Sequence, residues 1–203
     1  MKPEQKKLWN KLLDEMKNDN ISCHLHYAKL YTSRFPDRGA GWMALADVLS
    51  KMARYSEARD ALKRAKLLCP KERLYIVFGG FGDLDMEKGD YLCAEKWYRK
   101  AIESRESVID FNSLGVCLRN QGKFSEAKKC YKKALKISSD IPVEVYSNLG
   151  FILIAEKKYK EALNYFEKAI EIDPEWEPAK EAQRDIKNLL LIKKKANRRL
   201  KLE

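Results

Sequence analysis

Apolar and small residues recur along this chain in steps of three and four, and the same pattern returns at a nearly constant interval. Segments 111–139 and 146–174 both read as an aromatic residue, Leu-Gly three residues later, another Leu, a polar turn, and a second apolar stripe around Glu-Ala. Steps of three and four place side chains on one face of a helix. Each segment therefore predicts two helices that pack against each other through their apolar faces.

The alanines of the second stripe give the period of the repeat. Ala58, Ala94, Ala127 and Ala162 are separated by 36, 33 and 35 residues. These intervals bracket the period of about 34 residues that is typical of tetratricopeptide repeats. With four copies in frame, the sequence resembles the tetratricopeptide repeat family over residues 39–176.

This resemblance implies an all-α fold, a right-handed superhelical solenoid of antiparallel helix pairs. The four expected repeats cover residues 39–72, 75–107, 108–141 and 143–176. Residues 1–38 fit the frame as a divergent N-terminal repeat in which His24 replaces the anchoring Ala. Residues 177–203 are expected to form a capping helix that ends in a basic tail, because terminal elements shield the ends of such arrays.

One glycine-rich stretch raises the possibility of a nucleotide-binding loop. Gly79, Gly80 and Gly82 follow an apolar run. A Walker loop requires a Lys after its last glycine, whereas Asp83 stands there, and Asp85 stands where a dinucleotide fingerprint requires its third glycine. We therefore predict no nucleotide site in this stretch.

In the repeat frame this stretch belongs to the first helix of the second full repeat. Gly82 becomes the small residue that lets the paired helix approach, which places Asp85 where the other repeats have Leu. A shift by one residue would bury Leu84 instead, and we keep the first frame. Because each helical glycine costs about 1 kcal/mol relative to Ala, this helix is predicted to be the weakest, and Gly79 to leave a shallow gap in the groove floor.

The resemblance also implies a binding site, since the first helices of such repeats line a concave groove that takes an extended peptide or a partner helix. By frame, the expected groove residues are Met43, Asp47, Gly79, Asp83, Asn112, Val116, Arg119, Ser147, Asn148, Phe151 and Ile154. Asn amides can pair with a peptide backbone, and the apolar residues can receive its side chains. The alternative is that the Asn residues are merely solvated and the apolar residues pack against a neighbouring helix.

One known ligand class is excluded by the frame. Related domains that bind the acidic tails of chaperones do so with a carboxylate clamp of Lys, Asn and Arg. The matching positions here carry no basic residue and include Asp47 or Asp83. We therefore expect no clamp for chaperone tails.

Residues suited to catalysis or metal binding are sparse. His24 and His26 lie two positions apart, so they point to different sides of a helix, and Cys23 lacks a paired ligand. Neighbours in a helix do not face each other, which argues against a Cys23–His24 nucleophile pair. We therefore predict no enzyme activity, no cofactor and no metal.

Composition and the cysteine content indicate where in the cell the protein is expected. Hydrophobic residues make up 45% of the 203 residues and charged residues 35%, which is the balance of a soluble helical protein. No apolar run reaches the roughly 18 residues that a membrane span requires, and the N-terminus lacks the apolar core of a secretory signal. The five cysteines are odd in number and form no C-x-x-C pair. These features predict a cytoplasmic protein.

The net charge of +11 is concentrated at the C-terminus, where residues 177–203 carry nine Lys or Arg against four acids. The candidate anion-binding residues are Lys193, Lys194, Lys195, Arg198, Arg199 and Lys201. Such a tail can bind nucleic acid or an anionic surface, but basic residues also stabilise a helix C-terminus, and no aromatics are interleaved for base stacking. The sequence thus favours a non-enzymatic scaffold or adaptor that binds a segment of another protein, with nucleic-acid binding through the tail as the alternative.

Overall fold

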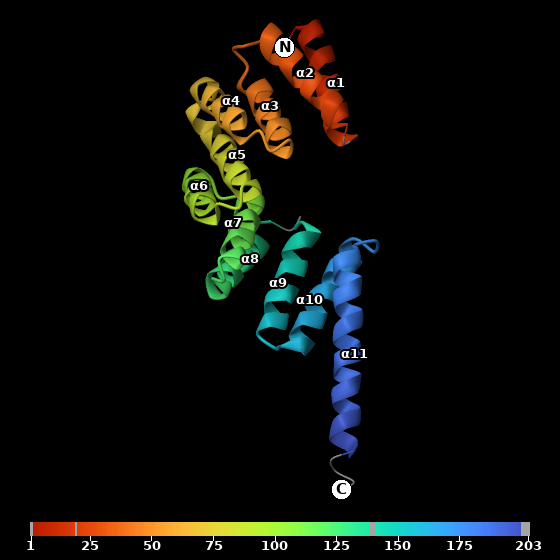
Figure 1. Cartoon of the computed structure of the whole chain (residues 1–203). Helices are drawn as coiled ribbons and strands as arrows, with labels where there is room; N and C mark the ends of the chain where they lie inside the picture. The colour runs from red at the N-terminus through yellow and green to blue at the C-terminus, as the bar shows by residue number, and fades with distance from the viewer. Residues whose placement is uncertain (1, 19, 139–140, 200–203) are drawn as a thin grey trace.

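The computed structural model describes residues 2–18, 20–138 and 141–199, and within these residues the fold is all-α (Figure 1). The helices are α1 (Pro3–Lys17), α2 (Ile21–Arg34), α3 (Gly39–Lys51), α4 (Tyr55–Leu68), α5 (Leu74–Glu87), α6 (Tyr91–Ser104), α7 (Val108–Asn120), α8 (Phe124–Ile137), α9 (Val143–Ala155), α10 (Tyr159–Ile172) and α11 (Glu177–Arg199), with the short 3-10 helix η1 (Lys71–Arg73) before α5. The expected right-handed solenoid of antiparallel helix pairs is confirmed.

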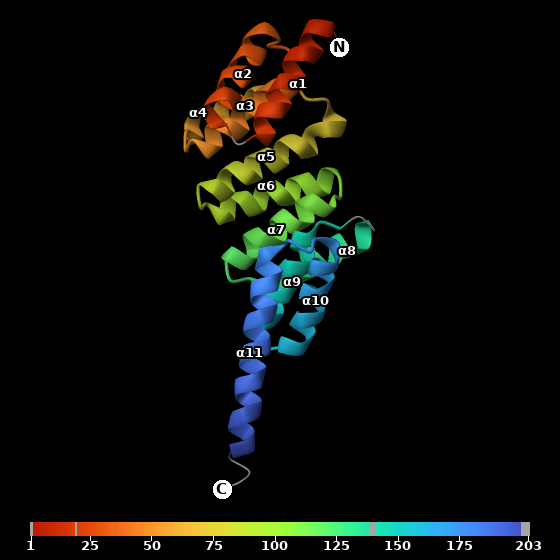
Figure 2. The same cartoon turned by 90° about the vertical axis from the view of Figure 1, so that its right-hand side faces the viewer.

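The helices stack in two layers. Consecutive helices pack as pairs, and the odd-numbered helices also contact one another along the array, from α3 to α5, α7 and α9. The odd-numbered helices therefore form the inner layer of the superhelix. Figure 2 shows the pairs following one another from the N-terminus, with the C-terminal part of α11 extending past the other helices.

A close contact between a glycine and an aromatic ring joins the two helices in three of the four full repeats. The contact joins Gly82 with Tyr98, Gly115 with Tyr131 and Gly150 with Phe166. A methyl group at any of these glycines would lie within 2.4–2.6 Å of the ring, so only glycine fits. The first full repeat has Ala46 and Leu62 at the two positions, both buried, where the smaller partner leaves room for a methyl group.

The turn between the two helices of each full repeat also has a conserved backbone shape within this chain. Ala53, Gly89, Gly122 and Lys157 occupy one position of the turn, and all four have positive φ, between 58° and 79°. This left-handed conformation ends a helix efficiently and favours glycine. Two of the four turns therefore carry a residue that fits the conformation less well.

Asp85 is buried on the face of α5 where the other repeats present Leu. Its side chain is 1% exposed and pairs with Arg59 from α4 of the preceding repeat. Together with the Gly82–Tyr98 contact, this agrees with the frame that the sequence favoured. Leu84 is buried as well, so no shift of the helix is needed to cover it.

Polar contacts link the other repeats at the equivalent position. Glu95 of α6 accepts hydrogen bonds from Lys123, at 2.9 Å, and from Gln121, at 2.9 Å, both after α7. Lys128 of α8 pairs with Glu156 at 2.6 Å. Each junction between full repeats therefore carries an ion pair at its edge beside an apolar core.

The core runs through the array as three adjoining clusters, over α1–α5, α6–α9 and α9–α11. In the N-terminal pair, His24 is buried at the position of the anchoring Ala. At the other end, α11 buries Ala179, Ala182 and Ile186 against the last repeat. Among the described residues, no helix is both long and apolar enough to cross a membrane.

Candidate peptide-binding groove

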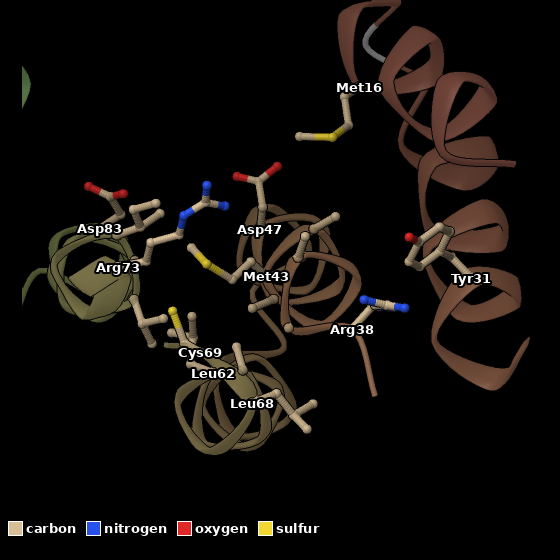
Figure 3. Close-up of a pocket in the computed structure, with 18 of the residues that line it drawn as sticks. Met16, Tyr31, Arg38, Met43, Asp47, Leu62, Leu68, Cys69, Arg73 and Asp83 are labelled. Carbon is tan, nitrogen blue, oxygen red and sulfur yellow. The ribbon is translucent and has the colours of Figure 1, made fainter. Parts of the chain in front are cut away.

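The inner layer forms a groove whose N-terminal part is a wide hollow. This N-terminal groove lies between α1, α3 and α5, encloses about 890 Å³ and has the end of α4 as its floor (Figure 3). Its apolar lining includes Trp9, Met16, Met43, Leu62, Leu68 and Ile76. The apolar floor of the groove can receive apolar side chains of a ligand.

Two carboxylates stand at the opening of the N-terminal groove. Asp47 of α3 and Asp83 of α5 occupy the same position in successive repeats, and both line the hollow. Asp47 pairs with Lys51 on its own helix at 3.3 Å. Asp83 accepts a hydrogen bond from the Tyr98 hydroxyl at 2.8 Å. The sequence-predicted groove residues Met43, Asp47 and Asp83 are thus brought together in one site.

Asp83 is exposed to solvent, but nearby protein atoms remove part of the water around its carboxylate. This partial desolvation, together with the charges of Asp110, Asp47 and Glu87, raises the pKa of Asp83 to about 6, although the hydrogen bond from Tyr98 opposes the shift. Burial likewise raises the pKa of Asp110. The carboxylates around Asp83 therefore lie close enough together for their charges to interact.

The glycines of α5 have different surroundings. Gly80 lies on the floor, where a methyl group would approach Leu62 to 3.0 Å and Met43 to 3.5 Å. Gly79 does not line the hollow, and a methyl group there would meet only the Asp110 carboxylate, at 3.4 Å. The sequence frame singled out Gly79, whereas the close approach to the floor belongs to Gly80.

In the middle of the array the polar groove residues contact one another. Arg119 donates a hydrogen bond to the Asn148 side-chain carbonyl at 3.0 Å, and the Asn148 amide donates to the Asn112 side-chain carbonyl at 3.1 Å. The two Asn residues lie on adjacent helices of the inner layer. Their amides are therefore partly used within the protein, and a peptide would have to share or replace these bonds.

At the C-terminal end the expected groove residues are covered. Ser147 is 2% exposed and accepts a hydrogen bond from the Trp176 indole at 2.8 Å. Phe151 and Ile154 belong to the cluster that packs with α11, and they line a smaller hollow of about 400 Å³ beside that helix. Phe151 and Ile154 therefore pack against a neighbouring helix, which was the alternative to peptide binding in the sequence analysis.

The remaining candidates are more dispersed. Val116 is half-buried and packs at the edge of the central core cluster. Lys193 and Lys194 are exposed on α11, and the Lys193 ammonium lies 4.7 Å from the centre of the Tyr159 ring. The backbone of α11 includes Lys195, Arg198 and Arg199, but their side chains, like Lys201 as a whole, lie outside the described part of the chain.

Ser50, which the repeat frame places in the groove lining together with Met43 and Asp47, is a further polar residue of the N-terminal groove. Ser50 of α3 lines the hollow and is 9% exposed, and its hydroxyl has no hydrogen-bond partner among the described residues. Asp47 Oδ2 makes no hydrogen bond of good geometry there, but the Lys51 ammonium lies 3.3 Å from it. Ser50 lies one turn after Asp47 on the same helix.

The stacked helix pairs and their concave groove define a helical-repeat protein, and comparisons give its family. Residues 40–72 and 108–175 match models of the tetratricopeptide repeat. The chain is 30% identical over 116 residues to human Tetratricopeptide repeat protein 13, and 26% identical over 98 residues to a TPR repeat-containing protein of Methanocaldococcus jannaschii. These regions span 57% and 48% of this chain but only 13% and 17% of the two relatives.

Solved structures show the same fold. A tetratricopeptide repeat protein from Parabacteroides merdae aligns with a TM-score of 0.75 at 17% identity, over 88% of this chain and 69% of that one. A chain of the APC/C hetero-tetramer Cut9-Hcn1 gives 0.73 at 17% identity, over 90% of this chain and 40% of that one. YrrB, described as a TPR protein with an unusual peptide-binding site, gives 0.59 at 18% identity, over 87% and 90%. The chain belongs to the tetratricopeptide repeat family.

Proposed function

We propose that this protein is a non-enzymatic scaffold or adaptor that holds a peptide or helical segment of another protein in its concave groove. The observation that carries the proposal is the N-terminal groove, an open hollow of about 890 Å³ with an apolar floor and a polar rim. Such a combination suits recognition of a segment by apolar anchors and fixed polar contacts. The family mediates protein–protein interactions, and YrrB, which has the same fold, carries a peptide-binding site.

The proposal also includes the cellular location of the protein. All five cysteines are unpaired, which is the usual state in a reducing compartment, and we place the protein in the cytoplasm. The alternative, binding of nucleic acid through the C-terminal tail, stays a prediction. No contact among the described residues favours it over the groove.

A selection of random displayed peptides against the whole chain tests the groove. Binders from this selection are expected to lose about tenfold or more in affinity when Met43→Glu places a charge on the apolar floor. Leu92→Glu is the matched control, because Leu92 is 64% exposed on α6, outside the groove. Peptides that bind wild type and Met43→Glu equally, or a selection that returns no binder, would contradict the proposed function.

A further inference from the structure

The N-terminal groove is acidic in a protein whose net charge is +11. Asp47 and Asp83 project from adjacent inner helices, and Glu87 lies one turn beyond Asp83 on α5 in the same hollow. Asp110 of α7 lies close behind, since its charge also acts on Asp83. The whole lining holds four carboxylates and three cations, so the groove is weakly acidic in a basic molecule.

The three cations of the lining leave one negative charge unbalanced. Arg38 pairs with Asp37 at 3.4 Å, and Lys51 pairs with Asp47 at 3.3 Å. Arg73, an exposed residue of η1, extends into the space between Asp47 and Asp83 in Figure 3, yet it forms no ion pair with any residue that the structure describes. The space thus admits a guanidinium group, and one Asp83 oxygen remains free beside the oxygen bound by Tyr98.

A second observation points to a ligand with hydrogen-bond donors. The Ser50 hydroxyl lines the same hollow, is nine-tenths buried, and has no hydrogen-bond partner among the described residues. Buried polar atoms without partners are costly and uncommon. A bound segment that brings an N–H donor would satisfy this hydroxyl oxygen.

We propose that the N-terminal groove binds a basic amphipathic segment of a partner protein. An apolar side chain of the segment rests on Met43 and Leu62, and a neighbouring Lys or Arg lies between the carboxylates of Asp47 and Asp83. This inference rests on the proposed function and specifies the chemistry of the partner. Acidic peptides and nucleic acids are disfavoured, because the same carboxylates repel them.

Binding of such a segment is coupled to the charge of Asp83. The groups that face this carboxylate are Asp47 from α3, Glu87 on α5, Tyr98 from α6, Asp110 from α7 and Arg73 from η1. Since the pKa of Asp83 in the free protein is about 6, a bound cation must displace a proton below that pH. Affinity is therefore expected to be highest above pH 6 and to fall as the pH is lowered through 6.

Three fluorescein-labelled peptides test the proposal, with fluorescence anisotropy as the measurement. Their sequences repeat Leu-Arg, Leu-Gln or Leu-Glu, so that an extended peptide presents Leu on one side and the second residue on the other. The Leu-Arg peptide is expected to bind about tenfold more tightly than the Leu-Gln peptide, and the Leu-Glu peptide to bind weakest, because a charge-assisted bond contributes about 1.5 kcal/mol. The net charge of +11 would favour the acidic Leu-Glu peptide. Tighter binding of the Leu-Arg peptide would therefore result from the groove and not from the overall charge.

Variants then locate the binding. Asp83→Asn and Asp47→Asn are each expected to remove most of the preference for Leu-Arg, whereas Asp60→Asn, at an exposed position of α4, removes the same charge without effect. Arg73→Ala is expected to strengthen Leu-Arg binding by several-fold, because it removes the competing cation. This gain cannot result from misfolding, and circular dichroism checks the folding of the Asp variants.

The possible results separate the two proposals. Equal binding of Leu-Arg and Leu-Gln, with both lost in Met43→Glu, would overturn the basic-segment inference and leave the groove as a binding site. An Asp83→Asn variant that keeps the preference for Leu-Arg would also overturn the inference. If none of the three peptides binds and the displayed library yields no binder, the proposed function fails together with the inference.

Discussion

Asp85 shows how one residue can depart from a repeat pattern without breaking the fold. Three repeats place Leu at this position, and the second full repeat places a carboxylate there that is 1% exposed. Arg59 from the preceding repeat compensates for the buried charge. Burial raises the pKa of Asp85 while Arg59 lowers it, so the pair offsets a desolvation cost rather than adding much net stability.

This balance gives a prediction from two substitutions. Asp85→Leu is expected to raise the free energy of unfolding by about 1 kcal/mol, because replacing a buried ion pair by an apolar side chain is commonly neutral or stabilising. Arg59→Met should lower it by about 3 kcal/mol, since it leaves the carboxylate buried and unpaired. Urea unfolding measures both values. A greater loss in Asp85→Leu than in Arg59→Met would contradict this account.

At the scale of the element, α5 carries more glycine than its contacts require. Gly82 is fixed by the Tyr98 ring and Gly80 by the groove floor, whereas a methyl group at Gly79 has only an ordinary contact with Asp110. The helix therefore retains one glycine that packing does not demand. Gly79 therefore lowers the local stability of α5. A benefit would arise only if the backbone of a partner occupied the space beside it.

Substitution of the helix glycines distinguishes these possibilities. Gly79→Ala is expected to raise the free energy of unfolding by about 1 kcal/mol through helix propensity and to leave peptide affinity unchanged. Gly82→Ala, the matched control, should lower it by about 1–3 kcal/mol because the methyl group overlaps Tyr98. Thermal unfolding gives the stabilities. Weaker peptide binding by a stabilised Gly79→Ala variant would show that a ligand uses the gap.

The junction between the second and third full repeats contains a carboxylate with three donors. Burial alone would raise the pKa of Glu95, but hydrogen bonds from Lys123, Arg99 and Gln121 prevail and lower it from 4.5 to about 2. A lowered pKa in the folded state means that the stabilisation is fully present above pH 4.5 and is lost as the pH falls toward 2.

Glu95→Gln is therefore expected to lower the free energy of unfolding by about 2 kcal/mol at neutral pH. The difference from wild type should shrink below pH 4.5 and disappear near pH 2. Glu103→Gln, at an exposed position of the same helix, is the control and should show little change. A difference between Glu95→Gln and wild type that persists unchanged at low pH would rule out this electrostatic explanation.

For the whole molecule, the sequence predicted the architecture because the repeat pattern records local packing. The alanine spacing and the small residue at Gly82 follow directly from contacts within one helix pair. The ion pair between Arg59 and Asp85 was not predicted, since it joins different repeats through side chains that the pattern leaves polar. The covering of Ser147 by Trp176 was also not predicted, because it depends on the path of the loop before α11.

The candidate site was predicted in part for a related reason. The frame correctly brought Met43, Asp47 and Asp83 to one surface, since equivalent positions of stacked repeats lie side by side. It could not tell an open surface from one that α11 covers, as at Phe151. The proposed binding of these residues to a partner remains to be tested.

The hydrogen bond between Trp176 and Ser147 makes the protein suitable for spectroscopy. The chain has four tryptophans, and they are distributed along the array as Trp9 in α1, Trp42 in α3, Trp97 in α6 and Trp176 before α11. Replacing the other three by Phe would leave one indole whose emission reports whether α11 is seated on the last repeat. A second variant that keeps Trp9 alone would report on the ligand groove, so the two ends of the solenoid can be followed in separate variants.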